Sequence, residues 1–261
     1  MIPAPYQIVN PNRPSLEWQG RCALAIMAKA PHAGKVKTRL SPPLNPEQAA
    51  ALNIAFLKDT VACLEEVSSA LPANPVVSFT PRGEESGFQG IIPNHVVLVP
   101  QRGDGFGERL LFTAEDLLAA GFSAVCLIDS DSPTVPADAY AKAVERLLAE
   151  KDCAVLGPSN DGGYYMIGLN AVRPRLFEGI AWSTEIVADQ TRQRAREIGL
   201  PMYTLPTWFD VDDRETLLRL YRELIACESD RKGFRAPHTR QFLQTIGKQL
   251  GEAELPAAAQ V

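Results

Sequence analysis

Short apolar runs alternate with longer stretches of helical character through the first two thirds of this chain. The apolar runs have the length of buried strands and lie at residues 22–28, 75–79, 95–99, 123–128 and 153–156. Helices are predicted between them, at residues 46–69, about 108–120 and about 136–150. Strands that alternate with helices form βαβ crossovers. The pattern therefore predicts a three-layer α/β/α fold, in which a mostly parallel sheet has helices on both faces.

Composition places the predicted boundaries of this fold. A chain of 261 residues suits one large α/β domain, which we expect at residues 21–228. Residues 1–20 are rich in Pro and Asn and are predicted to form a flexible N-terminal arm. The composition shifts after about residue 229, so we expect residues 229–261 to form a helical extension with a loose tail.

Charge and hydropathy exclude two classes of partner. The formal net charge is -5, from 26 basic and 31 acidic residues, so the chain lacks the basic excess of a nucleic-acid-binding protein. No apolar run reaches the roughly 20 residues that cross a bilayer, and the first twenty residues do not resemble a signal peptide. We therefore expect a soluble cytoplasmic protein. Its five cysteines have no metal-binding spacing and are interpreted as reduced: Cys22, Cys63, Cys126, Cys153 and Cys227.

A basic loop follows the first predicted strand. It has the sequence Lys-Ala-Pro-His-Ala-Gly-Lys-Val-Lys-Thr-Arg-Leu over residues 29–40. Four cations and a glycine at a strand end suit the binding of phosphate oxygens. A P-loop does not fit, because Lys29 stands where its first Gly belongs and Val36 where its Ser or Thr belongs. A solvated basic loop is the alternative interpretation.

Acidic residues follow later strands. Asp129 and Asp131 come directly after the strand at 123–128, where two carboxylates one residue apart can bind a hard divalent cation. The alternative is a turn in which an Asp or Ser caps the next helix. Asp210 is a further candidate acid, whereas Asp212 with Glu215 resembles a capping box that begins a helix.

Two further segments are candidates for substrate contacts. Asp161 and the paired glycines Gly162 and Gly163 permit close backbone approach to a ligand, although Asp-Gly is equally a hairpin signal. Trp182 could form a wall for a sugar or pack in the core. Ser183 is predicted to be the N-cap of a helix over residues 185–198.

Taken in order, the motifs AKAPHAGKVKTRL, QRGDGFGERL, DSDSPTVP, GPSNDGGYYMIGL, WST and FDVDD resemble those of the DUF2064 family, also called rSAM/selenodomain-associated transferase 1. The resemblance spans about residues 22–225 and implies a GT-A fold. Members are described as nucleotide-diphospho-sugar transferases, some in connection with arsenosugar synthesis. Phospholactate guanylyltransferases and molybdenum cofactor nucleotidyltransferases share this fold and a similar first loop.

The resemblance implies roles for individual positions. It implies that Lys29, Lys37 and Arg39 hold nucleotide phosphates and that Asp131 is the principal ligand of Mg²⁺ or Mn²⁺. Asp129 stands where relatives more often have a small residue, which weakens its assignment as a ligand. The assignments in full are phosphate binding for Ala28, Lys29, Gly34, Lys37, Arg39, Gly105 and Arg109; metal binding for Asp129, Asp131 and Asp210; catalysis for Asp131, Asp161 and Asp210; and substrate binding for Gly162, Gly163, Tyr164 and Trp182.

Two reactions fit these residues. The DxD triplet and the resemblance favour glycosyl transfer from a nucleotide sugar to a small-molecule acceptor. The basic loop suits a triphosphate and favours nucleotidyl transfer to a phosphorylated small molecule, with release of pyrophosphate. We favour glycosyl transfer narrowly. A third hypothesis, a nucleotide-binding protein without catalysis, is disfavoured by the retained acids at 129, 131, 161 and 210.

Overall fold

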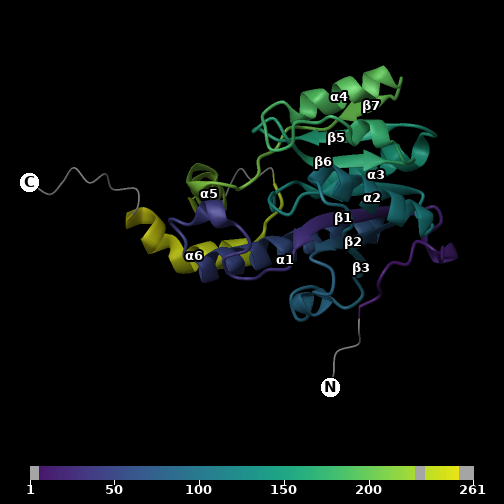
Figure 1. Cartoon of the computed structure of the whole chain (residues 1–261). Helices are drawn as coiled ribbons and strands as arrows, with labels where there is room; N and C mark the ends of the chain where they lie inside the picture. The colour runs from purple at the N-terminus through teal and green to yellow at the C-terminus, as the bar shows by residue number, and fades with distance from the viewer. Residues whose placement is uncertain (1–5, 227–232, 253–261) are drawn as a thin grey trace, which may run out of the picture.

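A computed structural model describes residues 6–226 and 233–252 of the chain, and within them the strands form one seven-stranded sheet. The strand order is β3-β2-β1-β4-β6-β5-β7 (Figure 1). All neighbouring pairs are parallel except those of β6, which is antiparallel to β4 and β5. The predicted mostly parallel α/β architecture is confirmed.

The strands are β1 (Cys22–Lys29), β2 (Ala73–Thr80), β3 (Val97–Pro100), β4 (Ala124–Ile128), β5 (Ala154–Pro158), β6 (Tyr164–Leu169) and β7 (Met202–Thr204). The α-helices are α1 (Pro46–Ala70), α2 (Phe106–Ala119), α3 (Ala137–Ala149), α4 (Val187–Glu197), α5 (Arg214–Tyr221) and α6 (Pro237–Glu252). Short 3-10 helices span Leu16–Trp18, Thr38–Leu40, Glu85–Phe88 and Pro174–Phe177, and a π-helical turn spans Arg222–Ala226.

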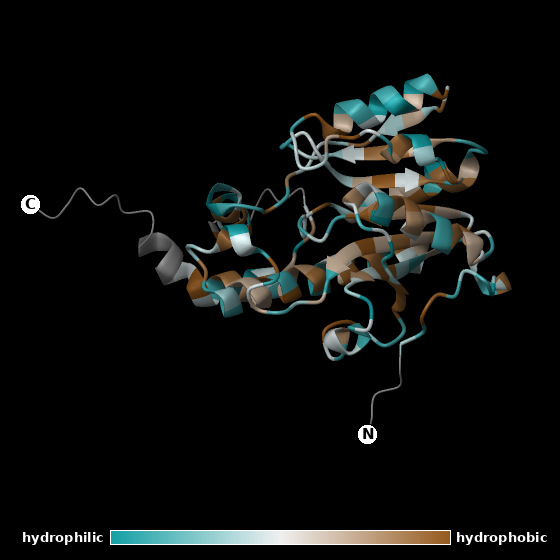
Figure 2. Cartoon of the chain, viewed as in Figure 1, coloured by the Kyte–Doolittle hydropathy of each residue, from teal (hydrophilic) through white to brown (hydrophobic). Residues whose placement is uncertain are grey.

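Alternate residues of β1 divide between two hydrophobic cores. Cys22, Leu24 and Ile26 face the core that α1 and α3 cover, and Ala23 and Ala25 face the core that α2 and α4 cover. Successive strand side chains point to opposite faces, so a strand that is apolar at every position is buried on both. Figure 2 shows the central strands mostly brown, whereas α4 is largely teal.

A third apolar cluster lies beyond one end of the sheet, where α6 packs beside α1 (Figure 1). Asp59 of α1 joins the two helices. Its carboxylate is fully buried and accepts hydrogen bonds from the backbone N–H groups of His238 and Thr239, at 3.0 and 2.7 Å. The first N–H groups of a helix have no partner within it, so Asp59 caps α6 from another helix.

Parts of the predicted terminal segments pack against the domain. The Tyr6 hydroxyl donates to the carbonyls of Phe88 and Ile92, and Ile8 forms a β-bridge with Leu98. The start of the predicted arm, at Tyr6 and Ile8, therefore lies beside β3 and its preceding segment, and α6 forms much of the predicted helical extension. Residues 1–5 of the arm, Cys227, residues 229–232 and residues 253–261 of the predicted tail lie outside the described residues.

Two predicted helix caps are wrong. Helix α4 begins at Val187 with Ile186 as its N-cap, while Ser183 has a left-handed φ of 65°. Helix α5 takes its capping box from Asp213, whose side chain accepts from the Thr216 N–H at 2.8 Å, so Asp212 is released from that role. The cap of α1 is as predicted: Asn45 and Gln48 bond reciprocally.

The hairpin interpretation of the Asp-Gly-Gly segment is confirmed, because β5 and β6 pair antiparallel around residues 159–163. The sequence did not predict β6 or β7 as strands. Among the described residues, no helix is long and apolar enough to cross a membrane.

We expect Asp59→Ala to lower the free energy of unfolding by about 1–3 kcal/mol, because two buried N–H groups of α6 lose their acceptor. Urea denaturation measures the loss. Glu66→Ala, an exposed change on the same helix, is the matched control and should cost less than about 0.5 kcal/mol. Equal stability of the two variants would contradict the capping role.

The same variant has a predictable pH dependence. Burial raises the pKa of the Asp59 carboxyl above its usual value, against the opposing hydrogen bonds from α6. A carboxyl with a raised folded-state pKa stabilises the fold most at acidic pH, and this contribution decreases as the pH rises through that value. The loss in Asp59→Ala should therefore be larger at about pH 4 than at about pH 8. A larger loss at the higher pH would contradict this sign.

Candidate active site

Two adjoining cavities open at the carboxyl ends of β1 and β4. The first, here called the basic cavity, has a volume of about 310 Å³, and its charged lining residues are Lys29, Lys35, Lys37, Arg39, Arg109, Asp131 and Asp212. The second, here called the acidic cavity, has a volume of about 430 Å³, and its charged lining residues are Arg39, Asp129, Asp131, Asp161, Glu185, Asp210 and Asp212. The two share a wall formed by Met27, Arg39, Phe106, Asp131 and Asp212.

The sheet topology explains why these residues meet. Strands β1 and β4 are parallel neighbours, so the loop after Lys29 and the loop after Ile128 leave the sheet at the same edge. Strand β6 is antiparallel, so its first residue, Tyr164, lies at this edge as well. Ligands of open parallel sheets bind outside the carboxyl ends of the strands.

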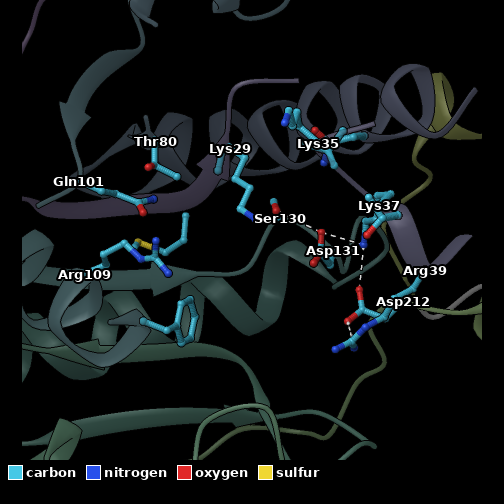
Figure 3. Close-up of a pocket in the computed structure, with 16 residues that line it drawn as sticks. Lys29, Lys35, Lys37, Arg39, Thr80, Gln101, Arg109, Ser130, Asp131 and Asp212 are labelled. Carbon is cyan, nitrogen blue, oxygen red and sulfur yellow. Dashed lines mark hydrogen bonds and ion pairs between the residues drawn. The ribbon is translucent and has the colours of Figure 1, made fainter. Parts of the chain in front are cut away.

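Cations surround the basic cavity from three segments of the chain. Figure 3 shows Lys29 at the end of β1 and Arg109 of α2 on one side, with Lys37 and Arg39 of the loop after β1 on the other. Lys29 and Lys35 are exposed, and 73% of the Arg39 side chain is exposed. These side chains can turn toward an anion in the cavity without losing a buried partner.

Lys37 differs from the other cations because its side chain is only 4% exposed. Its Nζ lies 2.8 Å from Asp131 Oδ1 and 3.1 Å from Asp212 Oδ1, and it donates to the Val211 carbonyl at 2.6 Å. Burial by itself would lower the pKa of Lys37, but the carboxylates of Asp131 and Asp212 outweigh it and raise the pKa. The ammonium is therefore charged and tightly held.

Asp129 stabilises the turn that carries Asp131. Its Oδ2 accepts from the Ser132 hydroxyl at 2.7 Å, and its Oδ1 lies 3.4 Å from the Asp131 N–H. Burial, followed by the charge of Asp131, raises the pKa of Asp129 well above its usual value. Asp129 therefore closes this turn, but the predicted alternative of an Asp or Ser cap is wrong, because the N-cap of α3 is Pro136 and no side chain caps that helix.

Asp210 and Asp161 add further carboxylates to the lining of the acidic cavity. Burial, the charge of Asp161 and the charge of Asp212 together raise the pKa of Asp210 to about 6. Asp161 is exposed, and its Oδ1 accepts from the Gly163 N–H at 2.8 Å. Negative charge thus accumulates in one region, and Lys37 is the buried cation that offsets it.

The donor chemistry of this region fits a hard divalent cation, since carboxylate oxygens are the preferred ligands of Mg²⁺ and Mn²⁺. Burial and then the charges of neighbouring carboxylates raise the pKa values of Asp129 and Asp210, and a divalent cation would neutralise part of that negative charge. Among the described residues, however, no group of three His, Cys, Asp or Glu side chains forms a ready-made metal site. A cation would therefore draw Asp131 together with its neighbours as it binds.

Aromatic rings form the remaining wall of the acidic cavity. Trp182 makes edge-to-face contacts with Phe106 and Tyr164, with ring centroids 5.2 and 6.4 Å apart. Gly107 lies directly beneath the indole of Trp182, and a Cβ there would come within 2.7 Å of its Nε1. The glycine therefore permits Trp182 to pack across the start of α2.

Most of the predicted site residues line one cavity or the other, and three do not. The predicted residues that line a cavity are Ala28, Lys29, Lys37, Arg39, Arg109, Asp129, Asp131, Asp161, Gly163, Tyr164, Trp182 and Asp210. Gly34 is exposed, and Gly105 donates its N–H to Glu108 at the start of α2. Gly162 has a φ of 88° and packs against the Glu185 backbone, which leaves no room for a side chain.

Sequence analysis missed several lining residues. Gln101, at the end of β3, and Thr80, at the end of β2, line the basic cavity, and their positions at strand ends were a usable signal. Asn53 of α1 and Glu185 had no such signal. Asp212 was interpreted as a cap because a suitable Glu follows three residues later, yet its side chain contacts both Lys37 and Arg39.

Comparison with known proteins shows a family model and several solved structures to which this chain is similar. Residues 63–184 match the model of the DUF2064 family, described as an uncharacterized protein conserved in bacteria. No curated protein matches the chain. A solved structure from Desulfovibrio desulfuricans G20, named provisionally as a nucleotide-diphospho-sugar transferase, is 29% identical, with a TM-score of 0.77 over 91% of this chain and 100% of that one.

Two nucleotidyltransferases share the fold at lower identity. CMP:2-keto-3-deoxy-manno-octonic acid synthetase, solved with CTP, is 12% identical, with a TM-score of 0.51 over 79% of this chain and 98% of that one. A cytidylyltransferase from Leptospira borgpetersenii serovar Hardjo-bovis is also 12% identical, with a TM-score of 0.50 over 92% and 99%. The predicted GT-A-type fold is confirmed, and it is common to sugar transferases and nucleotidyltransferases.

We expect Lys29→Met and Arg109→Met each to weaken the binding of inorganic pyrophosphate about tenfold, because each removes one charge-assisted contact. Isothermal titration calorimetry at constant ionic strength measures this. Lys151→Met, an exposed change beyond α3, removes the same charge and should leave the dissociation constant unchanged. Equal weakening by all three variants would mean that only net charge matters and that the basic cavity is not the binding site.

Proposed function

We propose that this protein is a divalent-cation-dependent glycosyltransferase that takes a sugar from a nucleoside-diphosphate sugar and passes it to a small-molecule acceptor. The observation that carries the proposal is the junction of two unlike cavities at Asp131. Cations outnumber carboxylates in the lining of one cavity, whereas carboxylates outnumber cations in the other, which aromatic rings also line. A nucleotide sugar also has two unlike parts, an anionic diphosphate and an uncharged, hydroxyl-rich ring, and these parts match the two cavities.

The basic cavity supplies the groups that a diphosphate needs. Lys29 and Arg109 approach it from one side and Arg39 from the other, so charge-assisted hydrogen bonds can reach both phosphates. The same groups would stabilise the charge that develops on the departing nucleoside diphosphate. Asp131 and Asp210 would hold the divalent cation, which supplies further neutralisation of that leaving group.

The acidic cavity suits an uncharged sugar and acceptor better than a phosphorylated one. Six carboxylates line it against a single cation, Arg39. Like charges repel strongly where solvent is partly excluded, so a phosphate group placed there would be disfavoured. Carboxylates instead accept hydrogen bonds from hydroxyl groups, and the Trp182 ring offers an apolar face to a sugar ring. This contrast favours glycosyl transfer over nucleotidyl transfer to a phosphorylated acceptor.

Asp161, an exposed carboxylate that is not assigned to the cation, is the candidate general base. In the transfer, the acceptor oxygen bonds to the anomeric carbon and the bond from that carbon to the phosphate oxygen breaks. The proton of the acceptor hydroxyl passes to a carboxylate on the acidic cavity wall.

Nucleotidyl transfer is the second candidate, and the number of cations supports it. Five basic side chains line the basic cavity, and the four besides the ion-paired Lys37 are more than a diphosphate requires. Two nucleotidyltransferases also share the fold. In this reaction the acceptor phosphate would attack the α-phosphorus of a nucleoside triphosphate and release pyrophosphate.

Product analysis separates the two reactions. The protein is incubated with Mg²⁺ or Mn²⁺, a panel of UDP-, GDP-, ADP- and CDP-sugars or the matching triphosphates, and a mixture of small hydroxylated acceptors. We expect release of a nucleoside diphosphate from at least one sugar nucleotide. Release of pyrophosphate from a triphosphate would establish nucleotidyl transfer instead. Absence of binding to every nucleotide with either metal would overturn both.

We expect Asp131→Asn to lower turnover at least about a hundredfold while the protein stays folded, because it removes a charged group at the junction of the cavities. Asp138→Asn on α3 is the control, since its side chain is 73% exposed and lines neither cavity. It should retain full turnover. Wild-type turnover in Asp131→Asn would show that the reaction takes place elsewhere.

A further inference from the structure

The Lys37 ammonium has no hydrogen left for a phosphate in this structure. An ammonium has three N–H donors, and Lys37 has three acceptors within 3.1 Å: Asp131 Oδ1, Asp212 Oδ1 and the Val211 carbonyl. The Phe56 ring lies 5.4 Å from the same nitrogen and closes another side. The side chain is therefore an internal partner of the acids, unlike the exposed cations beside it.

The backbone at Lys37 also indicates a fixed position. Its φ of 49° and ψ of 36° are left-handed, a conformation that a residue with a Cβ rarely adopts without compensation from its surroundings. The ion pairs at the end of its side chain supply such a compensation. They connect the loop after β1 to the turn after β4 and to the segment before α5.

Asp131 Oδ1 is the atom at which these contacts converge. It accepts from Lys37 at 2.8 Å and from the Ser130 hydroxyl at 3.1 Å. A divalent cation that bound this oxygen would approach the position that the Lys37 ammonium holds. Two cations cannot share one carboxylate oxygen at short range without strong mutual repulsion.

We propose that Lys37 is a positioning residue that acts as the internal counter-cation of the acid site and competes with the divalent cation for Asp131. The proposal rests on the function proposed above, in which Asp131 binds that cation. When the cation binds, Lys37 gives up Asp131 and keeps Asp212 and the Val211 carbonyl. Before it binds, Lys37 prevents the carboxylates from repelling one another and holds Asp131 at the cavity junction.

The test is a titration with Mn²⁺ alone, followed by electron paramagnetic resonance, with no nucleotide present. In Lys37→Met the competitor is gone, so we expect Mn²⁺ to bind about tenfold more tightly than in the wild type. Lys37→Arg keeps the charge and should stay within about threefold of the wild type. Asp131→Asn in the Lys37→Met background should abolish the gain. Equal or weaker Mn²⁺ binding by Lys37→Met would overturn the proposal.

A substitution at Asp212 tests the competition independently, because it leaves Lys37 in the protein. In Asp212→Asn, Lys37 has only Asp131 as a carboxylate partner, so we expect weaker Mn²⁺ binding than in the wild type. Adding Asp212→Asn to Lys37→Met should then have little effect, and the double-mutant cycle measures this coupling. Equal weakening in both backgrounds would make Asp212 a direct ligand and overturn the competition. If Lys37→Met does not fold, Lys37→Gln takes its place in the cycle.

These titrations contain no sugar nucleotide, so they stand apart from the product analysis. A protein that shows the predicted Mn²⁺ competition but no transfer would retain the role of Lys37 and lose the proposed reaction. A protein that transfers a sugar but gains no Mn²⁺ affinity in Lys37→Met would retain the reaction and lose the role of Lys37. Absence of Mn²⁺ binding in both the wild type and Lys37→Met would overturn the competition.

Discussion

Strand β1 is hydrogen-bonded on both sides to parallel strands, β2 and β4, and it is apolar along nearly its whole length. This pairing leaves both faces of the strand to be covered, by α1 and α3 on one side and α2 and α4 on the other. Polar groups can then enter only where the strands end. The basic loop after β1 and the acidic turn after β4 are placed side by side for that reason.

Carboxylates and cations lie close together at this edge of the sheet. The crowding of carboxylates is unfavourable for stability, and the same charged groups supply the chemistry of the site. Burial and the charges of neighbouring carboxylates raise the pKa values of Asp129 and Asp210, and the buried Lys37 offsets part of the negative charge. The exposed cations on the other side remain available to a ligand. The protein by itself balances the charges of the site only in part. An anionic donor and a divalent cation would complete the charge balance.

The sequence predicted the parts of this structure that depend on local pattern. The buried strands, the long helix α1 with its Asn45 cap, and the acids after β4 all follow from neighbouring residues. The predictions were wrong where tertiary contacts determine the local structure. Ser183 fits an N-cap by composition, but its segment packs against Gly162 and adopts a left-handed turn. Asp212 and Asp213 are equally good caps by type, but in the fold Asp213 caps α5 while Asp212 pairs with Lys37, a residue distant in the sequence.

The central claim is that one substrate occupies two unlike cavities that meet at Asp131. A crystal structure with a nucleoside-diphosphate sugar and Mn²⁺ is its most direct test. We predict the diphosphate in the basic cavity, near Lys29 and Arg109, and the sugar in the acidic cavity, against Trp182 and within reach of Asp161. A sugar that points away from the acidic cavity, or a diphosphate bound outside the basic one, would contradict the account.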